Sequence, residues 1–71
     1  MKELFDEINK WAGKYEFSFQ FWGESNNNVW ICKDGIELFS CYGCKSMEET
    51  VKIALNYIYK VNRIKFRYRI C

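Results

Sequence analysis

The chain has 71 residues, of which 49% are hydrophobic, 20% aromatic and 28% charged, and it contains no His and no Pro. This length predicts one domain, residues 1–71, and the hydrophobic content excludes an intrinsically disordered protein. The net charge is only +2, but residues 1–59 carry six Lys against nine acidic residues, whereas residues 60–71 carry five basic residues and no acidic one. The basic charge is therefore concentrated in the C-terminal segment.

A helix and a strand are the first elements that the pattern predicts. Over residues 2–12, apolar side chains recur at helical spacing and form one stripe, made of Leu4, Phe5, Ile8, Trp11 and Ala12. Residues 15–22 (YEFSFQFW) alternate strictly, which predicts a strand. Its Tyr and Phe side chains share one face, and that face is expected to belong to the core. A polar loop is expected at residues 23–28.

Residues 29–41 (VWICKDGIELFSC) predict a β-hairpin, because Asp34-Gly35 separates two apolar runs and favours a two-residue type I′ turn. A two-residue turn sets the register. The expected opposite pairs are Lys33 with Ile36, Cys32 with Glu37, Ile31 with Leu38, Trp30 with Phe39, and Val29 with Ser40. One face would then carry Trp30, Cys32, Phe39 and Cys41, and the other Val29, Ile31, Ile36 and Leu38.

The last third of the chain predicts a helix and then a change of period. Ser46-Met47-Glu48-Glu49 has the pattern of a capping box, so a helix is expected from Met47 to about Asn62. Residues 63–71 alternate apolar and basic side chains, which is typical of a strand or a strand-like arm. The order is therefore α-β-β-β-α with an expected fourth strand at the C-terminus.

This order predicts a two-layer α+β fold, in which an antiparallel sheet carries both helices on one face. The opposite face would be open, and either hairpin face would expose several large apolar side chains there. Soluble monomers rarely expose such a patch without a partner. We therefore expect the open face to bind a partner, or to form a homodimer. The expected contact residues are Trp22, Trp30, Ile31, Leu38 and Phe39.

The basic C-terminal segment has two interpretations. Arg63, Lys65, Arg67 and Arg69 are interleaved with apolar residues that include the aromatic Phe66 and Tyr68, and cations beside stackable rings are typical of a nucleic-acid-binding surface. An acidic protein partner would suit the same charges. In the other interpretation the apolar residues cover the core, and the basic residues face water and protect an edge strand.

The four Cys are interpreted mainly as small apolar residues with reduced thiols. The alternative is a structural zinc site, since Cys41 and Cys44 have C-x-x-C spacing and Cys32 and Cys71 would complete four thiolates. There is no His, no nucleophile motif and no phosphate-binding Gly loop, so neither catalysis nor a cofactor is expected. No apolar run is long enough for a membrane helix and no signal peptide is recognised, so a cytoplasmic location is expected.

The layout resembles two kinds of protein. Gly43-x-x-Ser46 leading into a helix with Ala54-Leu55 resembles double-stranded-RNA-binding domains. That family opens this helix with basic residues, whereas here it opens with Met47-Glu48-Glu49, so this helix is not expected to bind RNA. The size, the element order and the Asn/Lys/Ile-rich composition also resemble α-β-β-β-α anti-CRISPR proteins. This second resemblance implies a phage or mobile-element protein that inhibits a host protein or ribonucleoprotein in the host cytoplasm, and it identifies no site residues.

Overall fold

The computed structural model describes residues 2–65, which form a helix, three strands and a second helix. Their bounds are α1 Lys2–Trp11, β1 Glu16–Phe21, β2 Asn27–Lys33, β3 Ile36–Cys44 and α2 Met47–Val61. Every element predicted within this range is present. Most of the predicted fourth strand falls on residues 66–71, outside the described part of the chain.

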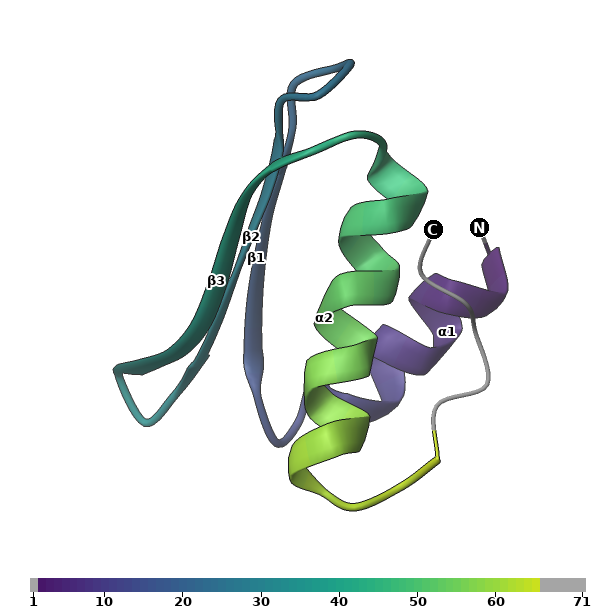
Figure 1. Cartoon of the computed structure of the whole chain (residues 1–71). Coiled ribbons are helices and arrows are strands. Elements are labelled where there is room, and N and C mark those ends of the chain that lie inside the picture. Colours follow the sequence, from purple (N-terminus) through teal and green to yellow (C-terminus); the bar gives the residue numbers. More distant parts are fainter. Residues whose placement is uncertain (1, 66–71) are drawn as a thin grey trace.

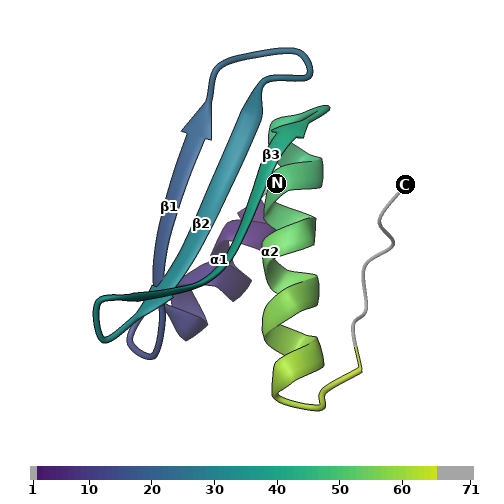
Figure 2. The same ribbon diagram turned by 60° about the vertical axis from the view of Figure 1, so that its left-hand side comes forward.

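The described residues form two layers. The sheet is antiparallel, with strand order β1-β2-β3, so that β2 is central and β1 and β3 are its edges. Figure 1 shows α1 and α2 on the same face of the sheet, and Figure 2 shows the three strands side by side. The predicted α+β fold is thus confirmed, with three strands in the range that the structure describes.

The core lies between α2 and the central strand. Val29 and Ile31 of β2 and the apolar stripe of α2 are completely buried; the stripe consists of Val51, Ala54, Leu55 and Ile58. Phe17 and Phe19 of β1 pair with Ile31 and Val29 and pack against this core. The predicted Phe face of β1 therefore does face the helices.

The turn between β2 and β3 has the predicted geometry. Asp34 and Gly35 both have positive φ, 54° and 78°, as a type I′ turn requires. Next to the turn, Lys33 pairs with Ile36 and Cys32 with Glu37, which confirms the first two predicted pairs.

One pair further from the turn, the predicted register is wrong. Ile31 pairs with Phe39, where the sequence predicted Leu38, and Leu38 is an extra residue in β3. Such an insertion is a β-bulge. Because successive side chains point to opposite faces of a strand, one extra residue moves the following side chains to the other face.

The bulge brings Phe39 and Cys41 to the helix-facing side, in contrast to the predicted hairpin faces. Phe39 stacks on Tyr57 of α2 with ring centroids 4.7 Å apart, and Cys41 packs against the core. Ser40 takes the place opposite Trp30 that was predicted for Phe39. Burial of the Phe39 ring under α2 offsets the local disruption of the ladder, and this long-range contact is not visible in the hairpin sequence.

A second register shift lies at the other end of β3, between the pairs Asn27–Cys44 and Val29–Cys41. The side chain of Asn28 accepts a hydrogen bond from the Gly43 backbone N–H at 2.9 Å. Asn27 is buried and donates to the Cys44 carbonyl at 3.0 Å. The predicted polar loop at residues 23–28 is thus shorter than expected, because two of its Asn residues belong to β2 and hold the end of β3.

A buried polar contact joins the two helices. Tyr59 of α2 donates a hydrogen bond from its hydroxyl to the Glu7 carboxylate of α1, and both residues are at least 94% buried. Lys10 lies 3.0 Å from the other Glu7 oxygen. A buried carboxylate is tolerated only when such partners satisfy it.

Helix α2 ends in a Schellman motif built on a non-glycine residue. The Ile64 N–H donates to the Tyr59 carbonyl at 2.8 Å, and the Arg63 N–H donates to the Lys60 carbonyl at 3.2 Å. Arg63 stands at the position that usually holds Gly and has a φ of 58°. A side chain at this φ is strained.

We expect Arg63→Gly to raise the free energy of unfolding by about 0.5–1 kcal/mol, because Gly adopts positive φ without a Cβ clash. Urea denaturation followed by circular dichroism measures the change. Lys60→Gly, inside the last turn of α2, is the control and should lower stability by about 1 kcal/mol. A loss of stability in Arg63→Gly would show that the Arg63 side chain stabilises the helix end more than its φ strains it.

Candidate interaction surface

The sheet face opposite the helices is polar around an aromatic centre. We call it the outer face. It consists of the β1 and β2 side chains that alternate with the buried ones. The neighbouring side chains of β3 complete it. Its residues are Glu16, Ser18, Gln20, Asn28, Trp30, Cys32, Glu37, Ser40 and Tyr42. Among the described residues, both helices lie on the other side of the sheet (Figure 1).

Trp30 and Tyr42 form the centre of this face. The Trp30 Nε1–H donates to the Tyr42 hydroxyl at 2.8 Å, and the two rings meet edge to face with centroids 5.5 Å apart. Trp30 is half-buried between Ser18 and Ser40, its partners on the two neighbouring strands, whereas Tyr42 is 62% exposed. The pair thus presents aromatic surface in a fixed orientation.

The five residues predicted to contact a partner through the open sheet face do not share one surface in the structure. Ile31 is completely buried and Phe39 packs under α2, so the prediction that these two meet a partner on the open face is wrong. Trp30 lies on the outer face, and Trp22 follows β1 with 69% exposure. Leu38 is 41% exposed at the bulge. The expected large apolar patch is therefore absent from the outer face within residues 2–65.

The sequence pattern did not indicate Tyr42, which follows the predicted hairpin of residues 29–41. Its position on the outer face follows from the bulge at Leu38, after which Ser40 and then Tyr42 point away from the helices. The hydrogen bond between the Asn28 side chain and Gly43 is specific to this arrangement, and no pattern of hydrophobic residues signals it.

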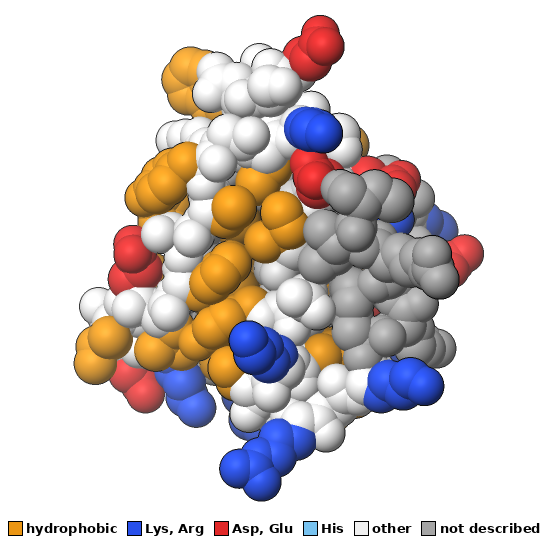
Figure 3. Space-filling model, viewed as in Figure 1, with side chains coloured by type: hydrophobic (Ala, Val, Ile, Leu, Met, Phe, Trp, Pro, Cys, Tyr) orange, Lys and Arg blue, Asp and Glu red, His pale blue; other side chains and the backbone are white. Residues whose placement is uncertain are grey.

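A second surface lies where β3 meets α2. Figure 3 shows hydrophobic side chains gathered between the sheet and this helix. We call this surface the β3–α2 strip and define it as Ile36, Leu38, Phe39, Tyr57 and Val61. Phe39 and Tyr57 are partly buried against each other, and the remaining three side chains are exposed. The strip follows the edge strand β3, whose bulge at Leu38 interrupts the regular edge and hinders pairing with another strand.

Basic side chains collect where α2 ends. Lys14 lies over the Trp11 ring at 5.8 Å, and Lys33 lies over the Tyr15 ring at 5.6 Å. Asn62, the C-cap of α2, donates to the Tyr15 hydroxyl at 3.2 Å, which places the helix end beside these rings. Figure 3 shows Lys and Arg side chains at this lower end. Of the predicted basic contacts, Arg63 and Lys65 are exposed, while Arg67 and Arg69 lie outside the described residues.

The cysteines do not assemble the four-thiolate zinc site that was considered. Cys32 lies on the outer face, whereas Cys41 and Cys44 lie on the helix-facing side, so the sheet separates them. Within residues 2–65, no three metal-ligating side chains come together. Cys71 falls outside this range. Cys44 donates to the Cys41 sulfur at 3.5 Å, and burial, together with that neighbour, raises the pKa of the Cys44 thiol.

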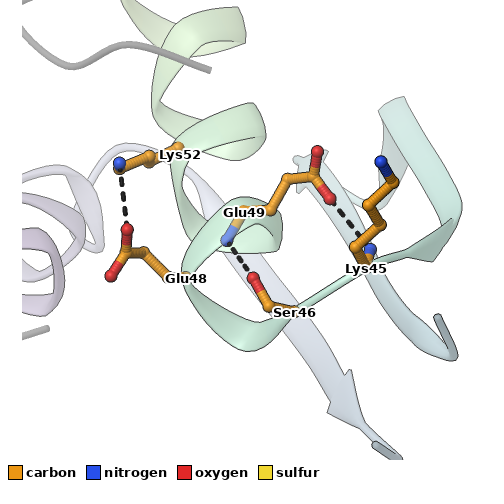
Figure 4. Close-up of a pocket in the computed structure, with 5 residues that line it drawn as sticks. All are labelled: Lys45, Ser46, Glu48, Glu49 and Lys52. Carbon is orange, nitrogen blue, oxygen red and sulfur yellow. Dashed lines mark hydrogen bonds and ion pairs between the residues drawn. The ribbon is translucent and has the colours of Figure 1, made fainter. Parts of the chain in front are cut away.

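A hollow of about 250 Å³ at the start of α2 is explained by helix capping (Figure 4). The Ser46 hydroxyl accepts from the Glu49 N–H at 3.1 Å, and the Glu49 carboxylate accepts from the Lys45 N–H at 2.9 Å. Lys52 pairs with Glu48 at 3.0 Å. The predicted capping box is confirmed, except that the Glu49 carboxylate binds the N–H of Lys45, one residue before the N-cap, and not that of Ser46 itself. The capping groups that line this hollow are thus hydrogen-bonded or ion-paired with one another.

Comparison of the chain with protein-family models, with curated proteins and with solved structures finds no match. Neither described helix combines the length and the apolar character needed to cross a membrane.

Proposed function

We propose that this chain is a non-enzymatic interaction protein that binds another macromolecule through its outer face. The observation that carries this proposal is the Trp30–Tyr42 pair, held edge to face and hydrogen-bonded on the sheet face that lacks helix cover within the described residues. Trp and Tyr are the side chains most enriched among residues that dominate binding energy.

The surroundings of the pair also favour macromolecular recognition. Small hydroxyl and amide side chains border Trp30 and Tyr42, namely Ser18, Gln20, Asn28 and Ser40. Rigid aromatic anchors among small hydrogen-bonding residues are typical of protein-binding surfaces such as antibody loops. Asn28 is hydrogen-bonded to both Gln20 and Gly43, so part of this surface is ordered before binding. Preordered side chains reduce the entropy lost on association.

The sharpest form of the proposal follows the layout that resembles anti-CRISPR proteins. In this form the chain comes from a phage or mobile element and inhibits a CRISPR nuclease or a related host ribonucleoprotein. Inhibition would occur by occlusion, because a binding free energy of about 12 kcal/mol holds a target at nanomolar concentration without any chemistry. Cleavage assays with purified CRISPR nucleases test this form directly, and a stoichiometric loss of cleavage is expected for one of them.

The outer face itself is tested by matched variants of the immobilised chain. Wild type recovers its partner from a bacterial lysate, and the affinity for that partner, once purified, is then measured for each variant. The double variant Trp30→Ser, Tyr42→Ser should weaken binding at least tenfold. The double variant Ile36→Ser, Leu38→Ser, on the β3–α2 strip, is the control and should bind as wild type does. Loss of binding in the control variant alone would show that the binding site is the β3–α2 strip and not the outer face.

A second copy of the chain is the alternative occupant of the outer face. Sedimentation equilibrium of the purified chain separates this case from a foreign partner. A monomer at micromolar concentration supports the proposal, and a dimer broken by Trp30→Ser, Tyr42→Ser would assign the face to self-association.

Nucleic-acid binding is a second candidate function, favoured by the basic side chains that lie over aromatic rings at the end of α2. Phosphate contacts release counterions, so binding of this kind weakens steeply as salt is added, whereas binding through the outer face should change little. Gel shifts with single-stranded and double-stranded DNA and RNA at two salt concentrations measure the difference. Lys14→Gln, Lys33→Gln should weaken the shift if this candidate is right. Removal of residues 64–71 tests the predicted role of the C-terminal segment.

A further inference from the structure

Two thiols come together at the end of β3. Cys41 and Cys44 are three residues apart, yet their sulfur atoms are 3.5 Å apart. In a regular strand these side chains would point to opposite faces. Here the register shift between the Asn27–Cys44 and Val29–Cys41 pairs, with Gly43 at a φ of 71°, brings both to the helix-facing side. A disulfide has sulfur atoms about 2.05 Å apart, so an approach of roughly 1.5 Å would close the bond.

We propose that Cys41 and Cys44 form a reversible dithiol–disulfide pair that reacts with low-molecular-weight disulfides. Cys41 is half-buried and Cys44 is buried, so the two thiols differ in access to a reagent. Burial also raises the pKa of the Cys44 thiol, which keeps Cys44 protonated and leaves the first attack to Cys41.

The reaction proceeds by two exchanges. The Cys41 thiolate attacks one sulfur of the small disulfide and forms a mixed disulfide, while the other half leaves as a thiolate. The Cys44 thiol then gives its proton to solvent, and its sulfur attacks the Cys41 sulfur and expels the second small thiolate. Both small thiolates take up protons, so the pair is oxidised by two electrons and one small disulfide is reduced to two thiols.

Tyr42 lies between the two cysteines in sequence and couples the pair to the outer face. Closing a ring across residues 41–44 constrains the backbone that carries Tyr42, and the Tyr42 hydroxyl accepts the hydrogen bond of the Trp30 indole. Oxidation is therefore expected to change the environment of Trp30. A consequence for binding rests on the proposed function, whereas disulfide formation and the change at Trp30 do not.

The test equilibrates the purified full chain with oxidised and reduced glutathione and maps disulfides by mass spectrometry. The expected result is an intramolecular link between Cys41 and Cys44, with loss of two hydrogen atoms, that reduced glutathione reverses. Cys32→Ser, which alters the thiol of the outer face, should retain this link. Cys41→Ser should lose it, and so should Cys44→Ser. If Cys44→Ser does not fold because the position is buried, the disulfide maps of the wild type and of Cys41→Ser are sufficient to test the proposal.

Two results would overturn the proposal. One is a wild-type chain that stays fully reduced at every glutathione ratio, and the other is a chain that forms only mixed disulfides or links through Cys32 or Cys71. The coupling to the outer face is read separately from the indole N–H resonance of Trp30, identified in Trp30→Phe. This resonance should shift on oxidation of the wild type and of Cys32→Ser but not of Cys41→Ser, and an unmoved resonance would refute the coupling. No partner is needed for either readout, so failure here is distinct from failure of the proposed function.

Discussion

Phe39→Ala is expected to lower the free energy of unfolding by about 2–3 kcal/mol, because it removes a large ring from a partly buried site. The ring of Phe39 stacks on Tyr57 and packs against the core. Leu38→Ala is the matched control from the adjacent residue. It should cost less than about 1 kcal/mol, since Leu38 is an exposed residue of the bulge. Urea denaturation followed by circular dichroism measures both.

The comparison of these two variants distinguishes the two registers of the hairpin. In the unbulged register predicted from the turn, Leu38 would pair with Ile31 and face the helices, while Phe39 would lie outside. A large cost for Leu38→Ala together with a small cost for Phe39→Ala would therefore support the unbulged register. Equal slopes of free energy against urea in both variants ensure that stabilities are compared for the same transition.

Tyr59→Phe is expected to lower the free energy of unfolding by about 2 kcal/mol. The substitution keeps the ring but removes the hydroxyl that donates to the buried Glu7 carboxylate. Hydrogen bonds to charged groups contribute about 1.5–3 kcal/mol, and the loss of a donor leaves a buried acceptor less well satisfied. Thermal and urea denaturation give the stability change.

Tyr57→Phe, two residues closer to the start of α2, serves as the control for this effect. Tyr57 is partly exposed, so its hydroxyl can reach water, and its ring still stacks on Phe39 after the substitution. A change within about 0.5 kcal/mol is expected. Equal costs for Tyr59→Phe and Tyr57→Phe would show that the Glu7 carboxylate does not depend on the Tyr59 hydroxyl.

Local signals predicted the elements of this fold well. The turn at Asp34-Gly35, the capping box at Ser46 and the alternation in β1 each depend on residues close together in the sequence, and the structure contains all three. The bulge at Leu38 was not predictable in this way. It depends on the fit of Phe39 against Tyr57, which lies on an element that the hairpin sequence does not contain.

The error in register carried over to the candidate site. Trp30 lies on the outer face, but Phe39 and Cys41, which were predicted beside it on β3, are replaced there by Ser40 and Tyr42, because β3 is turned over beyond Leu38. Tyr42, the partner of Trp30, was missed for the same reason. The sequence thus predicted that one face lies away from the helices but not its chemical character.

The most direct test of the outer face is the pattern of nuclear Overhauser effects in the full chain. A bulged register predicts a contact between the rings of Phe39 and Tyr57, and a contact between the Trp30 indole N–H and the ring of Tyr42. Both contacts should be observed in the same sample. Contacts of Trp30 with Phe39, and of Leu38 with Ile31, would contradict it, because the outer face would then be apolar and Tyr42 would not belong to its centre.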